Sequence, residues 1–144
     1  RGGLVANLTR MASFGHGEVE ARYRKVLEVE AAALSASRPG ATLGEVFAAL
    51  QGAYARVGFP RAWGEHHQGG VGGYRSRGVV ATPGHPLVLE AGMVLAWNPS
   101  LSGAKVEDTF LLTEGGLLNL TEDPFWPAVE VEGRRRPDLW RGGG

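Results

Sequence analysis

The sequence predicts an α+β fold in which two helices lie on one face of a sheet. Two stretches of helical periodicity follow each other within residues 18–57, and short β-prone runs separated by glycine turns fill residues 64–121. Successive helices beside such strands bury their apolar stripes together. A chain of 144 residues can bury a real core and normally forms one domain. Within this single domain, 1–144, we expect a strand at 1–14, two helices at 18–57, a site-bearing sheet at 64–121 and an irregular tail at 122–144.

The composition excludes several kinds of partner and site. The 15 basic and 15 acidic residues balance, so there is no electrostatic case for binding nucleic acid or a membrane surface. Without cysteine the chain forms neither a disulfide framework nor a thiolate zinc site, which suits a cytoplasmic protein. No apolar run approaches membrane-spanning length. The chain starts at once with a β-prone run at 4–9, so we expect it to be a fragment of a longer protein.

The first expected element is a strand at residues 4–14, where side chains alternate between two faces. Asn7 interrupts the apolar character of one face, between Val5 and Thr9. Asn7 either faces solvent or points into a site, and the alternation alone leaves both alternatives open.

Two helices are predicted from apolar periodicity and from the signals at their ends. Residues 18–37 carry apolar side chains at helical spacing, with acidic residues near the positive N-terminus and a Pro-Gly pair beyond the end. The second helix begins after Thr42, which forms a capping box with Glu45, and it closes at Gly58 in a left-handed cap.

A glycine-rich segment, residues 64–78, carries the first candidate site residues. His66 and His67 are adjacent, so in an extended segment they point to opposite sides and only one of them can face a given site. The glycines that follow, including Gly69 and Gly70, let the backbone approach a neighbour closely or take positive φ. The alternative for each histidine is a hydrogen-bonded structural residue, and the pattern does not decide between the two.

Two later strands carry the remaining polar candidates. Residues 93–97 predict a buried strand that ends at Asn98, and residues 104–112 predict the strand that follows. Glu107 and Asp108 lie within this second strand, where a buried carboxylate is costly unless it is paired or binds a ligand. The alternative is a carboxylate bonded to backbone or to arginine.

The last part of the chain shows turn signals and few apolar periodicities. A hairpin turn is expected at 113–116, with a short return strand at 117–121. The three consecutive arginines at 134–136 are expected on a solvated face of the irregular tail.

Four passages, taken in order, resemble the pita-bread (M24-type) hydrolases: aminopeptidase P, prolidase, methionine aminopeptidase and creatinase. Residues 3–10 resemble the family's "G-Y-x-S-D-L-T-R", 92–100 resemble "G-M-V-x-T-I-E-P-G", 105–115 resemble "R-I-E-D-T-x-L-V-T-E-x-G", and 66–70 lie where the family has "G-H-G-x-G". The likeness is specific only when the passages are taken together, and it is closest to a degenerate Xaa-Pro peptidase-like branch. It implies the pita-bread fold, an antiparallel sheet curved around a central site with helices on its outer face.

The resemblance also implies a set of site positions. The metallopeptidases of the family hold two metal ions with two Asp, one His and two Glu, whose bridging carboxylates keep the cations close. The first Asp would lie upstream of this chain; the others fall on Asn7, His67 or His66, Asn98 and Glu107. Two of these positions have lost their charge, and an amide oxygen cannot bridge two cations as a carboxylate does. The dinuclear site is therefore expected to be lost, and the alternative is a single divalent ion of manganese, zinc or cobalt at His67 and Glu107.

Creatinase shows that this fold can hydrolyse its substrate without metal. By that resemblance His67 acts as general base, and Glu107 binds a cationic group or orients His67. The family's second, proton-shuttling His falls near Tyr74 and is not evident here. The residues expected to bind substrate are His66, Asn7, Asn98, Tyr74 and Asp108.

The leading hypothesis is a hydrolase that cleaves a C–N bond in a small peptide, amide or guanidino compound. The second is a non-catalytic domain that keeps the fold and binds a small molecule or peptide. The third is a peptidase with a weak single-metal site. Family members often dimerise, so we expect the protein to form a homodimer. Its other expected partner is the small-molecule or peptide substrate.

Overall fold

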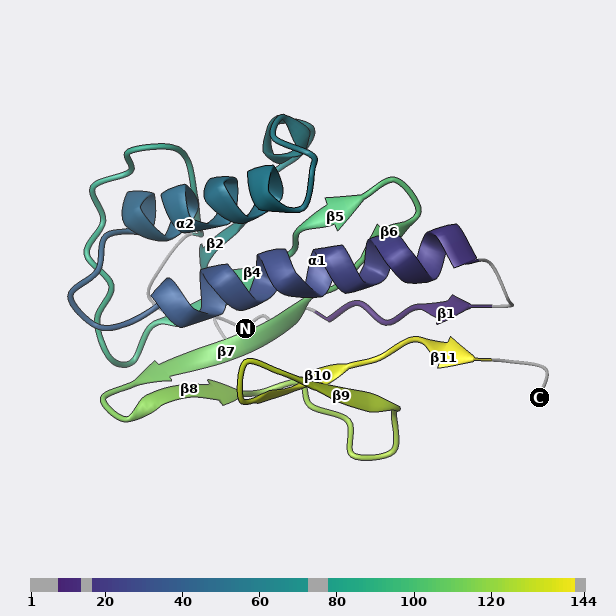
Figure 1. Cartoon of the computed structure of the whole chain (residues 1–144). Coiled ribbons are helices and arrows are strands. Elements are labelled where there is room, and N and C mark those ends of the chain that lie inside the picture. The colour runs from purple at the N-terminus through teal and green to yellow at the C-terminus, as the bar shows by residue number, and fades with distance from the viewer. Residues whose placement is uncertain (1–7, 14–16, 73–77, 142–144) are drawn as a thin grey trace.

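The computed structural model describes residues 8–13, 17–72 and 78–141. Its centre is a five-stranded sheet in the order β3-β2-β4-β7-β8, in which every neighbouring pair is antiparallel. The sheet curves, and the helices α1 and α2 lie together on one side of it (Figure 1). The predicted α+β class and the helices on one face of the sheet are confirmed.

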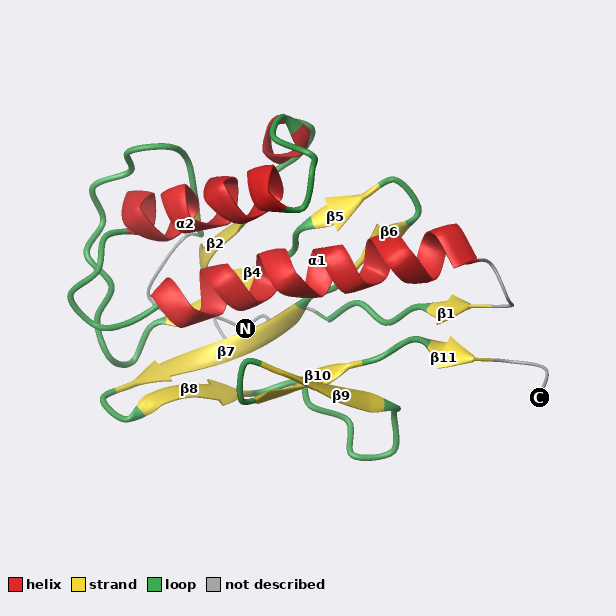
Figure 2. Ribbon diagram, viewed as in Figure 1, coloured by secondary structure: helices red, strands yellow, loops and turns green. Residues whose placement is uncertain are grey.

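The elements have the following bounds, and Figure 2 shows them by type. The helices are α1 (Gly17–Ala36), α2 (Leu43–Arg56) and a short 3-10 helix, η1 (Ala62–Gly64). The strands are β1 (Ala12–Ser13), β2 (Gly69–Gly72), β3 (Val79–Val80), β4 (Val94–Trp97), β5 (Ser100–Leu101), β6 (Ala104–Lys105), β7 (Asp108–Thr113), β8 (Gly116–Asn119), β9 (Ala128–Val131), β10 (Arg134–Pro137) and β11 (Trp140–Arg141).

Both helices form where periodicity and capping predict them. At the start of α2 the backbone N–H of Glu45 donates to Thr42 Oγ1 at 3.1 Å, and the Thr42 N–H donates to the Glu45 carboxylate at 2.7 Å, which completes the capping box. Gly58 ends this helix with φ of +96°. The apolar faces of both helices are buried in the main core. In the described part of the chain, neither helix combines the length and apolar character needed to cross a membrane.

The strand expected at 104–112 is divided in two. β6 pairs with β5 in a separate two-stranded hairpin, whereas β7 joins the main sheet beside β4. The division falls at Val106 and Glu107, where the chain passes from one sheet to the other. Glu107 there forms an isolated antiparallel bridge with Thr9.

The N-terminal strand expected at 4–14 lies only partly within the described residues, which exclude 4–7 and 14. Residues 8–13 are extended at two places: Thr9 bridges to Glu107, and β1 pairs in parallel with β11. The N-terminal and C-terminal parts of the chain therefore lie side by side (Figure 1).

The expectation of an irregular tail at 122–144 is wrong. β9 and β10 form an antiparallel hairpin, and Leu139 beyond it is buried in the core. The Trp126 indole N–H donates to the Asp138 carbonyl at 2.8 Å and so fastens the start of this segment to its end. The glycine and proline content suggested loops, but the burial of Leu139 and Pro137 holds the hairpin against the core.

We predict that the glycines of β2 differ in their tolerance of a side chain. A Cβ on Gly70 would lie 1.9 Å from the Val79 carbonyl oxygen of the neighbouring strand, whereas a Cβ on Gly72 would meet no atom within 4 Å. Gly70→Ala should lower the free energy of unfolding by about 1–3 kcal/mol or more, because β3 must move away. Gly72→Ala is the matched control and should change it by less than about 1 kcal/mol.

The measurement is equilibrium urea unfolding of both variants beside the unchanged protein. Equal stability of the two alanine variants would contradict the close approach of β2 and β3.

Candidate functional site

The candidate site lies where three neighbouring strands of the main sheet end. Gly69 of β2 faces Trp97 of β4, and Trp97 faces Asp108 of β7. Gln68 precedes β2, Asn98 follows β4 and Glu107 precedes β7, and Thr9 forms a bridge with Glu107. These four residues continue the edge of the sheet, and we call them the site row.

Backbone hydrogen bonds hold the site row together. The Asn98 N–H donates to the Gln68 carbonyl at 2.8 Å, and the Thr9 N–H donates to the Glu107 carbonyl at 2.8 Å. Trp97 is fully buried, and its indole N–H donates to Ser37 Oγ at the end of α1 at 3.0 Å. Because successive side chains along a strand alternate, Asn98 points away from the helix-covered face toward which Trp97 points.

Asn98 and Glu107 are the polar candidates that the fold brings together. Both are partly buried, and they are neighbours across the β4–β7 edge. Burial raises the pKa of the Glu107 carboxyl above its usual value, while Lys105 and the Thr9 hydroxyl oppose that shift. The side-chain oxygen of Asn98 is buried without a hydrogen-bond donor in the described part of the chain. This pair therefore offers acceptor oxygens to a ligand. The Asn98 amide oxygen has no donor of its own among the described residues.

His66 is held in a hydrogen-bond network and does not present a free ring. Its Nε2 lies 3.1 Å from the Asn98 carbonyl and 3.3 Å from Ser100 Oγ, and its Nδ1 lies 2.9 Å from Gln68 Nε2. Gln68 is fully buried, and its Oε1 accepts from the Tyr54 hydroxyl at 2.6 Å. For His66 the alternative of a hydrogen-bonded structural residue is therefore the one that the geometry supports.

His67 is exposed and lines an open hollow of about 350 Å³. Within the described residues its ring makes no hydrogen bond. Phe47 and Trp63, whose rings meet edge to face with centroids 5.7 Å apart, line the same hollow. The volume is in the range of small-ligand pockets, which are mostly apolar with a few polar groups. The two adjacent histidines thus have different environments, although both line the hollow and the chain bends at His66 instead of running extended.

Sequence reasoning misses two residues of this network. Helical periodicity assigns Tyr54 only to the apolar face of α2, and no pattern marks Gln68 as a site residue. Tyr54 is buried, which raises the pKa of its hydroxyl to about 12, so the hydroxyl keeps the proton that it donates. A tyrosine on a buried helix face needs a partner for its hydroxyl, and that requirement was the available signal.

A buried ion cluster lies behind the site row, and it corrects the expectation for the arginine run at 134–136. Arg136 is 1% exposed, and its guanidinium makes two hydrogen bonds to the Glu30 carboxylate of α1, at 2.7 and 2.5 Å. The same guanidinium lies 2.9 Å from the Asp108 carboxylate. Only Arg135 of the run is exposed. Alternation along β10 turns Arg136 inward while Arg135 faces solvent.

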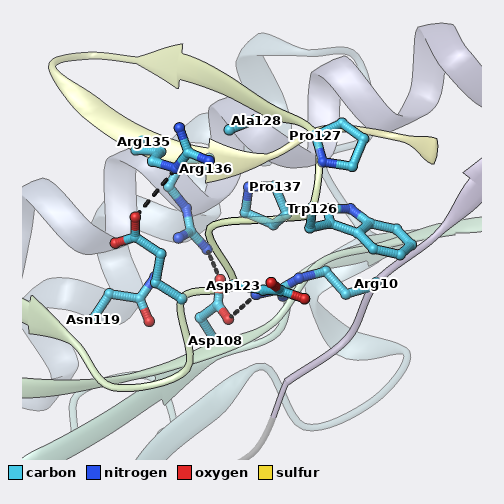
Figure 3. Close-up of a pocket in the computed structure, with 11 residues that line it drawn as sticks. Arg10, Asp108, Asn119, Asp123, Trp126, Pro127, Ala128, Arg135, Arg136 and Pro137 are labelled. Atoms are coloured by element: carbon cyan, nitrogen blue, oxygen red, sulfur yellow. Dashed lines mark ion pairs between the residues drawn. The ribbon is translucent and has the colours of Figure 1, made fainter.

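The cluster is completed by Arg10, as Figure 3 shows. Arg10 lies 2.8 Å from Asp108 on the side opposite Arg136, and it also donates to the Thr121 carbonyl at 3.0 Å. The Thr121 hydroxyl donates to Asp108 at 2.6 Å. Asp108 is fully buried, so the alternative of a carboxylate bonded to arginine is the one observed. The adjoining cavity of about 10 Å³ is at most large enough for one water molecule and cannot admit a substrate.

The remaining predicted site residues lie outside what the structure describes. Asn7 and Tyr74 fall within the undescribed ranges 1–7 and 73–77. Within residues 8–13, 17–72 and 78–141, no group of three or more His, Cys, Asp or Glu side chains is placed to hold a metal ion. The site row contributes one carboxylate and two side-chain amides, a set of donors that does not fit a pair of divalent cations.

Comparison with known proteins places this geometry in a family. The model of metallopeptidase family M24 matches residues 1–114. The agropine synthesis cyclase of Rhizobium rhizogenes is 34% identical over 132 residues, which are 85% of this chain and 33% of the cyclase. The chain spans about a third of the length of the curated relatives it matches.

Solved structures support the same assignment. The dipeptidase PepE from Mycobacterium ulcerans matches with a TM-score of 0.72 at 26% identity, covering 93% of this chain and 35% of that one. The prolidase from Pyrococcus horikoshii matches with a TM-score of 0.68 at 26% identity, covering 80% of this chain and 35% of the prolidase. The fold is therefore the pita-bread fold that the four sequence passages imply.

We predict that breaking the buried ion cluster destabilises the fold, because the remaining charges stay buried without a partner. Arg136→Met keeps the apolar stem but leaves Glu30 and Asp108 short of a cation, which should cost about 3–5 kcal/mol of unfolding free energy at neutral pH. The matched control is Arg135→Met. Arg135 pairs with Glu122 at 3.2 Å with both side chains about half exposed, so its loss should cost less than about 1 kcal/mol.

The cost of Arg136→Met should depend on pH in a defined direction. Burial already raises the pKa of Glu30, and Arg136 opposes that shift, so removing Arg136 raises this pKa further. A carboxyl whose pKa is higher in the folded state than in the unfolded state lowers stability as the pH rises from the unfolded to the folded value. Urea unfolding should therefore show the deficit of the variant shrinking in acid. A deficit that is constant across this range would contradict the charge-based explanation.

Proposed function

The chain belongs to metallopeptidase family M24, and we propose that it is a hydrolase-type domain of the Xaa-Pro peptidase and creatinase group that lacks a tightly held pair of metal ions. The bond cleaved is a C–N bond of a small peptide, amide or guanidino compound. Because the chain spans about a third of its curated relatives, this activity is proposed for the protein to which the domain contributes.

The observation that carries the proposal is the pair formed by Asn98 and Glu107 on the site row. Among the described residues the Asn98 side-chain oxygen is buried without a donor, and a polar atom in that state costs about 1–3 kcal/mol unless a partner arrives. In the described part of the chain Glu107 makes no ion pair. A ligand that carries N–H donors, such as an ammonium, amide or guanidinium group, satisfies both oxygens.

The donor set argues against the family's two metal ions. Bound metal would act as a Lewis acid and generate a nucleophilic hydroxide, and it requires several carboxylates to neutralise the charge. Asn98 replaces one of these carboxylates with a neutral amide, and Asn7 does so at a second position. Glu107 and His67 are the remaining side chains of the ligand type. We therefore assign the chemistry to the side chains of the chain.

In the proposed reaction His67 removes a proton from the attacking water at the hollow, and Glu107 on the site row holds a cationic or N–H group of the substrate. Neither Glu107 nor Asn98 lines the hollow, so the proposed substrate extends from the hollow to the site row. His67 suits this role because its ring is exposed at the hollow, whereas both ring nitrogens of His66 are already engaged. His66 then contacts the substrate through its position beside the hollow rather than as a base. Asn98 accepts an N–H of the substrate, and Asn7 and Tyr74 are proposed to complete the binding site.

Two alternatives have specific support. A binding domain without catalysis is favoured by His67 itself, because in the described residues no partner orients its ring. One relative is named as a cyclase and not as a peptidase, so similarity to this chain does not by itself imply peptide cleavage. A single weakly held manganese, zinc or cobalt ion at His67 and Glu107 is the third possibility, since both are metal-ligand residue types.

The partners of the protein are part of the proposal. Several large apolar side chains are exposed, among them Phe125 at 90% and Leu118 at 54%. Exposed apolar side chains mark surfaces that bind other proteins, and we propose that a second copy of the chain covers them, as in other family members that form dimers. A cytoplasmic location is proposed from the absence of cysteine, and neither nucleic acid nor a membrane is proposed as a partner.

The proposed function predicts a low metal content. Protein purified without chelator and soaked in manganese, zinc or cobalt should retain far less than two metal ions per chain by elemental analysis, because Asn98 and Asn7 do not supply the required negative charge. Retention of two ions per chain would contradict the proposal and identify the amide oxygens as ligands. One ion per chain, lost in Glu107→Gln, would support the single-metal alternative.

The proposed function also predicts the effect of changing the two proposed catalytic residues. Once a cleavable amide, dipeptide or guanidino compound is found, His67→Ala and Glu107→Gln should each lower kcat/KM by about 100-fold or more, in the range of general acid–base catalysis. His85→Ala is the control, since His85 belongs neither to the site row nor to the lining of the hollow, and this variant should retain activity. If both site variants turn over every ligand at the original rate, the catalytic assignment is wrong. If they still bind but nothing is cleaved by any form, the binding-domain alternative holds.

A further inference from the structure

We propose that Gln68 is a positioning residue that fixes His66 in the tautomer protonated on Nε2, so that His66 serves as a hydrogen-bond donor that clamps Asn98 and not as a base. This inference goes beyond the proposed function. It concerns the state of the free protein and holds whether or not a substrate is cleaved.

The orientation of the Gln68 amide follows from its neighbours. Its Nε2 lies 3.2 Å from the Trp63 carbonyl and 3.1 Å from the His66 carbonyl, and carbonyl oxygens only accept hydrogen bonds. The atom beside them must therefore be the NH₂ group. At the other end, Oε1 accepts from the Tyr54 hydroxyl at 2.6 Å. Exchanging the two ends of the amide would set an oxygen against two carbonyls.

The orientation of Gln68 determines where His66 carries its proton. The same NH₂ group lies 2.9 Å from His66 Nδ1. The NH₂ group has two hydrogens for three neighbouring acceptors, and Nδ1 is the nearest of the three, so we assign it one of the two hydrogens. Nδ1 then accepts and carries no proton of its own. The proton of the neutral ring is then on Nε2, which lies 3.1 Å from the Asn98 carbonyl. Each contact of the two ring nitrogens is compatible with this tautomer.

The consequence for the site is that Asn98 is held at both of its backbone groups. Its carbonyl accepts from His66 Nε2, and its N–H donates to the Gln68 carbonyl at 2.8 Å. Tyr54 extends the clamp, because its hydroxyl accepts from the Ser100 N–H at 2.9 Å while donating to Gln68. The three residues thus fix the backbone from which the Asn98 side chain projects, as residues that support a binding site commonly do.

The clamp also gives the two adjacent histidines different roles. The lone pair on His66 Nδ1 is directed at the side chain of Gln68, which is fully buried. The ring of His67 is exposed at the hollow and is not held in this way within the described residues. Which ring nitrogen of a histidine carries the proton is set by the hydrogen bond that the other nitrogen makes, and Gln68 supplies that bond here.

The test is nitrogen NMR of the full chain labelled with ¹⁵N in histidine, at neutral pH and without ligand. In the unchanged protein, His66 should show a one-bond proton coupling on Nε2 and none on Nδ1. The resonances are assigned by loss of the corresponding signal in His66→Gln and His67→Ala. A proton on Nδ1 of His66, or averaging between the two nitrogens, overturns the proposal.

Two variants test the role of Gln68 itself. Gln68→Glu replaces the NH₂ donor with an oxygen that accepts, so the proton of His66 should appear on Nδ1. Tyr54→Phe is the control, because the Trp63 and His66 carbonyls still orient the NH₂ group and the proton should stay on Nε2. If the glutamate variant does not fold, Gln68→Met decides the matter, because it removes the donor to Nδ1 and should shift the ¹⁵N resonance of that nitrogen. A residue that merely fills space would leave the His66 signals in place, and that result in a folded Gln68 variant overturns the assignment.

His85 is the internal control, because its ring accepts from the Leu87 N–H outside this network and its signals should be the same in all forms. The measurement involves no turnover, so its outcome is independent of the proposed hydrolase activity. If the tautomer is confirmed and no substrate is ever cleaved, the clamp stands and the hydrolase proposal fails.

Discussion

The buried pair between Arg136 and Glu30, extended through Asp108 to Arg10, is the interaction on which the rest of the structure depends. It contains two positive and two negative groups, so the cluster is neutral although it is almost entirely removed from water. Removing any one member leaves a buried charge uncompensated. The four residues come from the N-terminal segment, α1, β7 and β10, so segments far apart in the chain must assemble together (Figure 1).

This cluster reaches the site through neighbouring residues in the chain. Asp108 is adjacent to Glu107, and the Arg10 guanidinium approaches the Glu107 carbonyl at 3.4 Å. The arginine charges are already matched by Glu30 and Asp108, so they add little positive potential on the far side of the strand. Burial then dominates the environment of Glu107 and raises its pKa. A site of this kind attracts hydrogen-bond donors, and among the described residues Lys105 is the cation that acts on the Glu107 carboxyl.

Local patterns predicted the parts of the fold that local physics determines. The capping box at Thr42, the cap at Gly58 and the buried strand that ends at Trp97 all follow from signals within a few residues. The C-terminal hairpin did not follow, because its stability comes from the contact of Arg136 with Glu30, 106 residues away. One signal for that contact was present, since Glu30 lies on the apolar face of α1, where a charge needs a partner.

The site shows the same division between local and distant causes. The adjacency of two histidines predicted that only one of them would face a given site, but both line the hollow, His66 partly buried and hydrogen-bonded and His67 exposed. Which one is free could not be predicted, because the answer depends on Tyr54 and Gln68, which meet only after α2 packs beside β2. Glu107 and Asp108 presented the same ambiguity, and only the distant arginines show that Asp108 is the structural carboxylate.

Asn98 brings these constraints together. Its backbone is held on both sides by Gln68 and His66, while its side-chain oxygen is left buried without a donor among the described residues. Buried polar groups in proteins are rarely left unsatisfied, and among the described residues the other such atoms belong to the buried ion cluster: Arg10 Nε, Asp108 Oδ2 and Arg136 Nη1. Unsatisfied polar atoms that persist on a rigid backbone are typical of places where a ligand completes the hydrogen bonding. The resemblance puts a family carboxylate at this position, and under the proposed function the amide favours groups that need an acceptor over cations that need charge.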